Sequence, residues 1–288
     1  MGTLAGSRDP TAGPPDAFKA RRYDHRDLRL RLLSRAQPSH AERSIDVRPP
    51  EASTRDRYLD IEDWAWEIIE TVAPLTMTSP ERIYALLGAV DYLVANGVSG
   101  SVVECGVWRG GSMVAAAKRL LQLGVADRDL YLFDTFEGMP APTSDDSDLH
   151  GAPAEVLLAE ASRDKAVSGE PNVWCYADLD DVKASMTSSG YPAANCHYVV
   201  GKVEATVPDQ APREIALLRL DTDWYQSTLH ELDHLYDRLS PGGVLVIDDY
   251  GHWQGARRAT DEFFRRRGVH PLLQRIDYTG RLHIKPEG

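Results

Sequence analysis

The chain has 288 residues, and its 42% hydrophobic and 26% charged content is typical of a folded globular protein. Its formal net charge is -12, so the surface repels phosphate backbones and we expect no nucleic acid partner. No stretch approaches the roughly 18 consecutive apolar residues of a membrane span, so we expect no membrane association either.

Three cysteines, Cys105, Cys175 and Cys196, are odd in number and match neither a disulfide pattern nor a metal-ligand spacing. The first ten residues lack the hydrophobic centre of a signal peptide. These features predict reduced thiols in a cytoplasmic protein.

Residues 1–55 are rich in Pro, Ala, Arg and Asp, and two Pro-Pro pairs interrupt them. A short helix is expected across residues 24–36. We expect the rest to be flexible, or to be an arm that orders against a neighbouring subunit or a substrate. Self-association into a homo-oligomer is therefore expected, and residues 56–288 are expected to form the main domain.

Two helices begin the main domain. The first is expected over residues 64–72 and ends before Pro74. The second follows Ser79, a good N-cap, and Pro80, which suits the first helical position. Its apolar stripe continues to Val94, and Asn96 and Gly97 end it.

The first strand is expected over residues 101–106, and a glycine-containing turn over residues 107–112 leads into a helix over residues 113–123. Such a turn lets a ligand approach backbone amides at a helix N-terminus. Alone the pattern is weak evidence, because it lacks both the three-glycine dinucleotide spacing and the phosphate-loop lysine.

The second strand, residues 130–133, ends in Asp134. An acid at this edge can accept two hydrogen bonds from the ribose diol of a nucleotide. The structural alternative is that Asp134 caps the segment that follows it.

A glycine-, proline- and acid-rich loop begins at Phe136, and we expect residues 136–160 to form a lid over the strand edge. A polar helix over residues 178–188 precedes the third strand, residues 197–200. The turn at residues 201–204 is expected near an adenine ring, although capping and solvent exposure explain Lys202 and Glu204 equally well.

Two apolar runs, residues 217–220 and 244–247, end abruptly in carboxylates. A helix over residues 226–239, stopped by residues 240–243, separates them, so the strands should be parallel with adjacent carboxyl ends. Asp221, Asp248 and Asp249 could then converge on one cation, and three oxygen ligands without cysteine favour Mg²⁺ or Mn²⁺. The alternative is that these acids only cap strand ends and helix N-termini.

After a loop at residues 251–255, a helix is expected over residues 256–267. Residues 271–276 and 281–284 are expected to be two strands joined by a tight turn. The whole order predicts an α/β fold with a seven-stranded, mostly parallel, doubly wound sheet, the Rossmann-like architecture of class I methyltransferases, with an N-terminal helical extension.

Four motifs make a family resemblance specific. They are residues 104–112 (ECGVWRGGS), 133–140 (FDTFEGMP), 220–223 (LDTD) and 247–251 (IDDYG). In this order they resemble the macrocin O-methyltransferase family over about residues 60–285. The family consists of metal- and S-adenosylmethionine-dependent enzymes that methylate sugar hydroxyls on macrolide and related natural products.

The resemblance implies roles for individual residues. Asp221, Asp248 and Asp249 would hold Mg²⁺, and Asp223 would be the general base. Asp134 would hold the ribose of S-adenosylmethionine. The residues expected around the rest of the cofactor are Glu104, Gly106, Val107, Arg109, Gly110, Ser112, Gly201, Lys202, Val203 and Asp221.

Chemistry supports these roles independently, because a sugar hydroxyl has a pKa far above 7 and needs a metal or a base to lose its proton. His252 is a second candidate base on the adjacent loop. The structural alternative for Asp223 is the N-cap of the helix that follows it.

The expected function is Mg²⁺-dependent methylation of a deoxysugar hydroxyl on a glycosylated small molecule, such as a macrolide-type antibiotic. A catechol-like phenol is an alternative acceptor, because it also presents a vicinal diol to a metal. An NAD-dependent oxidoreductase is disfavoured, because its chemistry has no use for three carboxylates at the far strands. A non-catalytic binding protein with the same fold is the remaining alternative.

Overall fold

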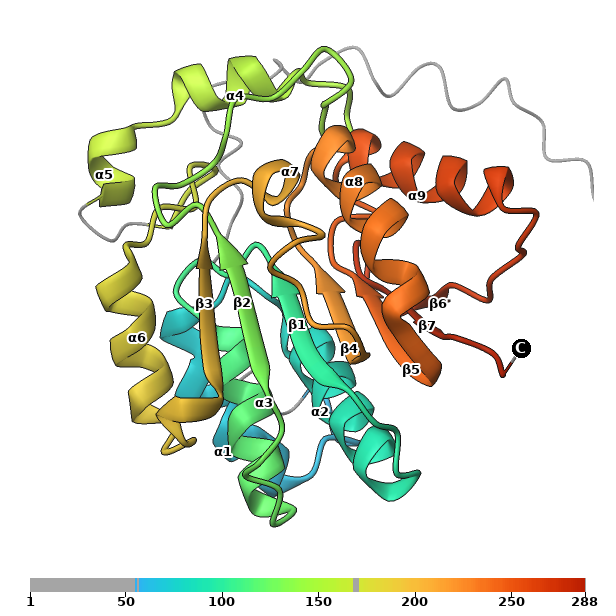
Figure 1. Cartoon of the computed structure of the whole chain (residues 1–288). Coiled ribbons are helices and arrows are strands. Elements are labelled where there is room, and N and C mark those ends of the chain that lie inside the picture. Colours follow the sequence, from blue (N-terminus) through green and yellow to red (C-terminus); the bar gives the residue numbers. More distant parts are fainter. Residues whose placement is uncertain (1–54, 56, 168–170, 288) are drawn as a thin grey trace, which may run out of the picture. The chain divides into compact units, whose positions relative to one another are not determined.

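A computed structural model describes residues 55, 57–167 and 171–287 of the chain. Its sheet has the strand order β3-β2-β1-β4-β5-β7-β6 (Figure 1). The strands are β1 (Ser101–Cys105), β2 (Leu130–Asp134), β3 (Cys196–Val200), β4 (Ile215–Leu220), β5 (Leu239–Ile247), β6 (Gln274–Arg275) and β7 (Arg281–Ile284). The helix expected over residues 24–36 lies outside the described residues, and the domain boundary at residue 55 stays a prediction.

Strands β1 to β5 are parallel to one another, and β7 is antiparallel to both β5 and β6. The prediction of a seven-stranded, mostly parallel sheet is therefore confirmed. From β1 the chain builds outward through β2 and β3 on one side, and β4 and β5 lie on the other. In sheets of this kind ligands bind outside the carboxyl ends of the strands where the order reverses, here between β1 and β4.

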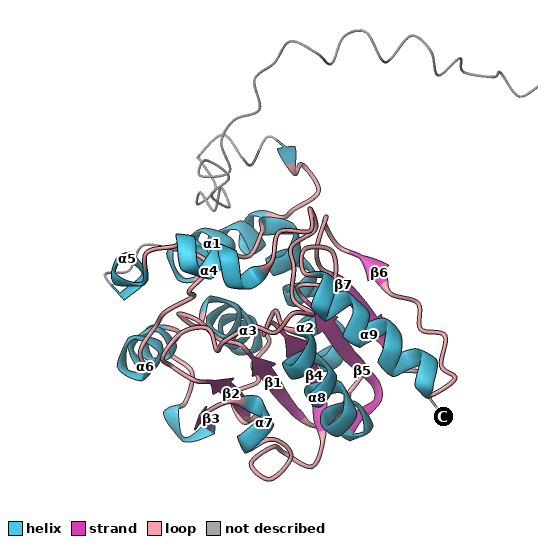
Figure 2. Cartoon of the chain, turned by 90° about the horizontal axis from the view of Figure 1, so that it is seen from above, coloured by secondary structure: helices cyan, strands magenta, loops and turns pink. Residues whose placement is uncertain are grey.

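Helices cover both faces of the sheet (Figures 1 and 2). One face packs against α1 (Asp63–Val72), α2 (Pro80–Ala95), α3 (Gly111–Gln122) and α6 (Leu179–Ser188). The other packs against α7 (Val203–Thr206), α8 (Tyr225–Leu235) and α9 (Gln254–Arg266). Successive side chains of a strand point to opposite faces, so Val102 and Val103 of β1 belong to different apolar clusters.

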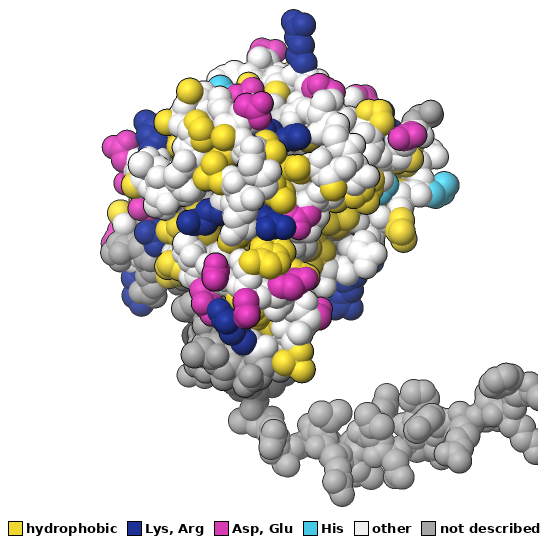
Figure 3. All heavy atoms as spheres, turned by 90° about the horizontal axis from the view of Figure 1, so that it is seen from below, with side chains coloured by type: hydrophobic (Ala, Val, Ile, Leu, Met, Phe, Trp, Pro, Cys, Tyr) yellow, Lys and Arg dark blue, Asp and Glu magenta, His cyan; other side chains and the backbone are white. Residues whose placement is uncertain are grey.

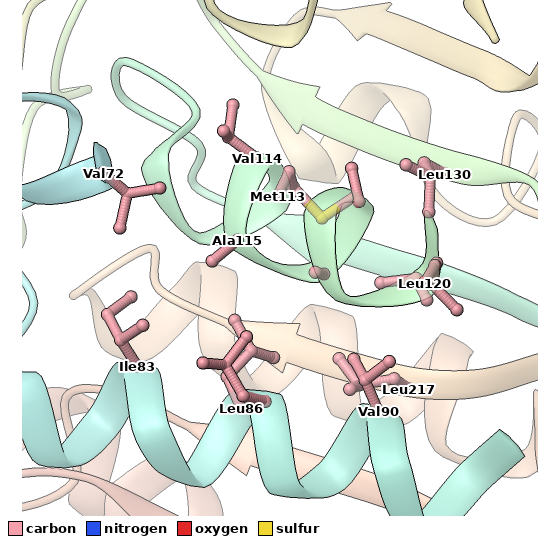
Figure 4. Packing of buried hydrophobic residues seen from close by; sticks show 14 of the residues in the cluster. Val72, Ile83, Leu86, Val90, Met113, Val114, Ala115, Leu120, Leu130 and Leu217 are labelled. Carbon is pink, nitrogen blue, oxygen red and sulfur yellow. The ribbon is translucent and has the colours of Figure 1, made fainter. Parts of the chain in front are cut away.

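The packing of α2 illustrates how its sequence specifies its place. Leu86 and Val90 lie one turn apart and point toward Leu217 of β4 and the apolar face of α3 (Figure 4). The predicted cap is confirmed, because the Ser79 hydroxyl accepts a hydrogen bond from the Arg82 amide at 3.3 Å. Burying each such aliphatic side chain contributes about 1.5–3 kcal/mol, which fixes the helix against the sheet.

Strand β5 corrects the sequence interpretation of residues 240–243. These residues were expected to end a helix as a turn, but they lie within β5. The physical reason is pairing with the C-terminal segment: the Gly242 amide donates to the Lys285 carbonyl, and the Lys285 amide donates to the Gly243 carbonyl, both at 2.8 Å. The preceding helix α8 accordingly ends at Leu235, earlier than expected.

Residues 136–160, the expected lid, run over the carboxyl ends of the strands and end in α4 (Ala154–Glu160); α5 (Arg163–Val167) follows (Figures 1 and 2). Asp146 anchors this segment, because its Oδ1 accepts a hydrogen bond from the Tyr225 amide and its Oδ2 accepts one from the Thr143 amide, both at 2.7 Å. An isolated bridge also pairs Asp148 with Trp253. The segment is thus tied to the starts of α8 and α9.

The opposite edge of the sheet looks different. Figure 3 shows acidic and basic side chains interspersed with hydrophobic ones on the face at the amino ends of the strands. Across the part of the chain that the structure describes, no helix is long and apolar enough to span a bilayer. A cluster of aspartates lies instead at the carboxyl ends of the parallel strands.

Candidate active site

A pocket opens at the carboxyl ends of β1, β2, β4 and β5. The space between its walls, with the open solvent at its mouth included, is about 1180 Å³. Near the ends of β1, β2 and β3 its lining comes from Gly106, Trp108, Phe133, Asp134, Thr135, Gly201, Lys202, Val203 and Glu204. On the far side lie Met77, Thr78, Arg82, Met139, Pro140, Cys175, His252, Trp253, Tyr278 and Thr279. Four aspartates, Asp221, Asp223, Asp248 and Asp249, lie on the pocket wall as well.

Three of these aspartates form a cluster. Asp221, Asp223 and Asp249 each offer one carboxylate oxygen, and these oxygens all lie within 4.8 Å of one another. The arrangement follows from the parallel pairing of β4 and β5. Their backbone hydrogen bonds extend one residue beyond the strands, because the Asp248 amide donates to the Leu220 carbonyl at 2.9 Å. In addition, the Asp223 amide donates to Asp249 Oδ2 at 3.3 Å.

The backbone around the pocket is held in a sparsely populated conformation. Asp223, Trp108 and Cys175 all line the pocket with positive φ, at 66°, 46° and 44°. A non-glycine residue pays an energetic cost of order 1–3 kcal/mol for such a conformation, and these residues cluster at functional sites. Asp223 thus combines this backbone conformation with a place in the carboxylate cluster.

Ionising all three carboxylates of the cluster is electrostatically unfavourable, although Arg219 contacts Asp221. Burial, aided by the charge of Asp221, raises the pKa of Asp223 to about 8. Burial also raises the pKa of Asp221 and of Asp249 well above the ordinary aspartate range, and neighbouring carboxylates add to both shifts. Three hard oxygen donors whose mutual repulsion a dication would relieve fit Mg²⁺ or Mn²⁺.

Asp248, the third predicted metal ligand, faces two arginines. Its Oδ1 accepts a hydrogen bond from Arg219 at 2.6 Å, and its Oδ2 forms a short contact with Arg82. Burial opposes ionisation, but these two cations lower the pKa of Asp248 below its ordinary value. Each carboxylate oxygen has a second lone pair, so the contacts leave coordination open.

The glycine turn after β1 brings two strand ends together. Gly106 has a φ of 81°, and a Cβ there would lie 2.0 Å from the Asp221 carbonyl oxygen. Only glycine fits this approach. Two predicted cofactor contacts, Gly106 and Asp221, are thereby held side by side on the pocket wall.

Asp134 lines the pocket, and its carboxylate already organises the backbone. Its Oδ2 accepts hydrogen bonds from the Val107 and Trp108 amides at 2.7 and 3.1 Å, and its Oδ1 accepts one from the Phe136 amide at 2.8 Å. These bonds clamp the glycine turn onto the end of β2. Holding a ribose remains a prediction for this residue.

The predicted cofactor residues divide into two groups. Those on the pocket lining are Gly106, Asp134, Gly201, Lys202, Val203 and Asp221. Those outside it are Glu104, Val107, Arg109, Gly110 and Ser112. Glu104 is 1% exposed and contacts Arg219, while Arg109 pairs with Asp181 at 2.9 Å. Their roles toward a cofactor stay predictions.

The far side of the pocket carries His252, the second candidate base. Its Nδ1 lies 3.4 Å from the Tyr278 hydroxyl oxygen, and burial lowers the pKa of its imidazole. Tyr278, Trp108 and Arg219 were not identified as site residues from the sequence. Only Arg219 gave a usable signal, an arginine between two leucines of an apolar strand.

The model of the macrocin O-methyltransferase (TylF) family matches residues 16–285 of the chain. The chain belongs to this family. It is an S-adenosylmethionine-dependent O-methyltransferase, and this assignment removes the oxidoreductase alternative.

Relatives with assigned activities support the assignment. The tetracenomycin 4'-O-methyltransferase of Streptomyces olivaceus, named for an 8-demethyl-8-(2,3-dimethoxy-alpha-L-rhamnosyl) substrate, is 34% identical over 205 residues, which are 71% of this chain and 73% of the relative. The mycinamicin III 3''-O-methyltransferase of Micromonospora griseorubida is 33% identical over 205 residues, 71% of this chain and 76% of the relative.

A solved structure shows the same fold. The O-methyltransferase NovP matches with a TM-score of 0.63 and 26% identity, covering 74% of this chain and 83% of NovP. The prediction of a class I methyltransferase fold is therefore confirmed.

Proposed function

We propose that the protein transfers the methyl group of S-adenosylmethionine to a hydroxyl of a deoxysugar on a glycosylated natural product, with Mg²⁺ or Mn²⁺ bound by Asp221, Asp248 and Asp249 and with Asp223 as the general base. The observation that carries the proposal is the convergence of Asp221, Asp223 and Asp249 within 4.8 Å in the pocket. The relatives named for methylation of a rhamnosylated tetracenomycin and of mycinamicin III support the acceptor class.

Asp221 and Asp249 would hold the cation, with Asp248 beside them. When bound, the cation would stabilise negative charge that develops on the acceptor oxygen. Asp223 would accept the proton of the acceptor hydroxyl while that oxygen forms its bond to the methyl carbon and the carbon–sulfur bond of the sulfonium breaks. His252 is the alternative base for the same proton.

On the cofactor side, Asp134 and the turn at Gly201 would position the nucleoside half of S-adenosylmethionine. Gly106 would let the rest of the cofactor approach the ends of β1 and β4. On the far side, the half-exposed aromatic ring of Tyr278 suits the apolar face of a sugar ring. These contacts would orient one hydroxyl toward the methyl group, and positioning of this kind supplies much of the rate enhancement.

A methyl transfer assay over a matched acceptor panel tests the proposal. The panel pairs mycinamicin III and the rhamnosylated tetracenomycin with their sugar-free counterparts and adds catechol. We expect methylation of at least one glycosylated acceptor, located on the sugar by fragmentation mass spectrometry, and none of its sugar-free counterpart. Methylation of catechol alone would favour the phenol alternative and contradict the sugar assignment.

Cation binding should release protons from the cluster. The pKa of Asp223 is raised to about 8, above its unfolded value, so this group is largely protonated at pH 7 without a cation. A bound dication favours the carboxylate form, so adding Mn²⁺ to the chelator-treated protein at pH 7 should release about one proton or more. A pH indicator in weak buffer measures the release.

The sign of this effect gives its control. At pH 9, above the pKa of Asp223, that group is already ionised, and proton release on Mn²⁺ addition should be smaller than at pH 7. The absence of proton release at pH 7, despite calorimetric evidence of binding, would contradict the assignment of these carboxylates as the cation site.

A further inference from the structure

Arg219 occupies an unusual position for a cation. It lies inside β4 between Leu218 and Leu220, and its side chain is 4% exposed. A buried charge is costly unless it is paired and hydrogen-bonded. The contacts of its guanidinium therefore indicate why an arginine stands here.

Each of the two terminal nitrogens of the Arg219 guanidinium donates hydrogen bonds to two side chains. Nη1 donates to Glu104 Oε1 at 2.5 Å and to Asp221 Oδ2 at 2.6 Å. Nη2 donates to Asp248 Oδ1 at 2.6 Å and to Thr78 Oγ1 at 3.1 Å. One planar group thus joins the ends of β1, β4 and β5 to the segment before α2.

A second arginine extends the network. Arg82 of α2 contacts Asp248 and also donates to Asp277 at 3.0 Å. Asp277 in turn accepts hydrogen bonds from the Thr279 and Gly280 amides, at 2.9 and 2.7 Å, in the turn that carries Tyr278. The Arg219 and Arg82 side chains therefore connect the aspartates of the cation site to the far wall of the pocket.

The carboxylate of Asp221 faces both Arg219 and the other two carboxylates of the cluster. Its Oδ2 is taken by Arg219, while the carboxylate still offers an oxygen to the cluster with Asp223 and Asp249. Without the contact with Arg219, the Asp221 side chain could rotate and turn its carboxylate away from Asp223 and Asp249. Only the rigid fork of arginine can hold Asp221 and Asp248 simultaneously from one side, because the lysine ammonium is a single point charge.

We propose that Arg219 is a positioning residue, which orients Asp221 toward the divalent cation and holds Asp248 in place beside it. The inference rests on the proposed function, since it concerns the cation site named there. Glu104 contributes from the other side of the guanidinium: its Oε1 holds Arg219, although its Oε2 is buried without a hydrogen-bond partner among the described residues.

The test is a titration of the full-length protein with Mn²⁺, without cofactor or acceptor. Electron paramagnetic resonance measures the concentration of free Mn²⁺ at each point. Arg219→Lys keeps the positive charge and loses the fork. We expect its dissociation constant for Mn²⁺ to rise roughly 10- to 100-fold, the usual cost of losing a group that orients metal ligands. A thermal melt of each protein reports folding separately.

Two further variants keep the test decisive. Thr78→Val removes one neutral partner of Nη2 and leaves all charges in place, so it should fold and weaken Mn²⁺ binding by a smaller factor. Arg119→Lys is the matched control, because Arg119 makes a bidentate pair with Asp91 on the outer helices, at 2.5 and 2.8 Å. Its Mn²⁺ affinity should equal that of the wild type.

The outcomes separate the two proposals. The positioning role would be overturned if the wild type binds Mn²⁺ tightly and both Arg219→Lys and Thr78→Val bind it as tightly or more tightly. If Arg219→Lys does not fold, an unchanged affinity in Thr78→Val still overturns it. Absence of Mn²⁺ binding by the wild type would instead remove the cation site itself, and with it the proposed metal dependence.

Discussion

Replacing Asp223 with asparagine is expected to lower kcat by roughly 10²- to 10⁴-fold, the usual cost of losing a general base. The amide cannot accept the proton of the acceptor hydroxyl, although it has nearly the same shape. S-adenosylmethionine binding should stay near the wild-type value, because Asp223 lies in the carboxylate cluster and is not among the residues proposed to bind the cofactor. Single-turnover methyl transfer and calorimetry measure the two quantities.

The structure sharpens this experiment, because the alternative role of Asp223 as a helix cap is wrong. Helix α8 begins at Tyr225 after Trp224, and the Tyr225 amide donates to Asp146. Asp233→Asn is a suitable control: Asp233 lies on the same helix and pairs with Arg266 at the surface, at 2.8 Å. A loss of tenfold or less in Asp223→Asn would favour His252 as the base.

Replacing Asp221 with asparagine should reduce turnover at low Mg²⁺ by more than about 100-fold, because loss of a direct ligand should exceed the cost of losing an outer partner. The variant removes one of the three clustered carboxylates and one counter-charge of Arg219. Raising the Mg²⁺ concentration should recover part of the activity. Initial rates over a Mg²⁺ titration measure both effects.

Folding must be checked in the same series, because Arg219 is buried and loses a charged partner. Two carboxylates, Glu104 and Asp248, remain in contact with it, so we expect the variant to fold. A wild-type Mg²⁺ dependence in folded Asp221→Asn would be incompatible with Asp221 as a ligand.

The position of the site could be predicted because it depends on strand order alone. Short apolar runs that end in acids read directly as buried strands, and the helix between residues 220 and 248 makes them parallel neighbours. Asp221 and Asp249 consequently meet at one sheet edge. The glycine turn at Gly106 was expected to let a ligand approach the backbone, and this stays a prediction; its close approach to the Asp221 carbonyl was not predicted.

Side-chain direction at that edge could not be predicted. Asp248 and Asp249 are consecutive residues just after β5, yet one faces two arginines and the other faces the cluster. Nothing local in the sequence indicates that Arg82, 166 residues away, contacts Asp248. Pairing across the fold decides these orientations.

Tertiary contacts also overrode local signals elsewhere. The Pro-Gly-Gly sequence at residues 241–243 normally ends an element, yet it extends β5 because the C-terminal segment supplies hydrogen-bond partners. Within the expected lid, α4 has a buried face of only Ala154 and Leu158, too short a stripe to recognise in advance.

The measurement that tests the central claim most directly is methyl transfer to a glycosylated acceptor by the chelator-treated enzyme before and after Mg²⁺ is restored. The cluster of Asp221, Asp223 and Asp249 predicts negligible transfer without the cation and recovery on its addition. Equal transfer under both conditions, with the product methylated on the sugar, would keep the enzyme class and contradict the cation site.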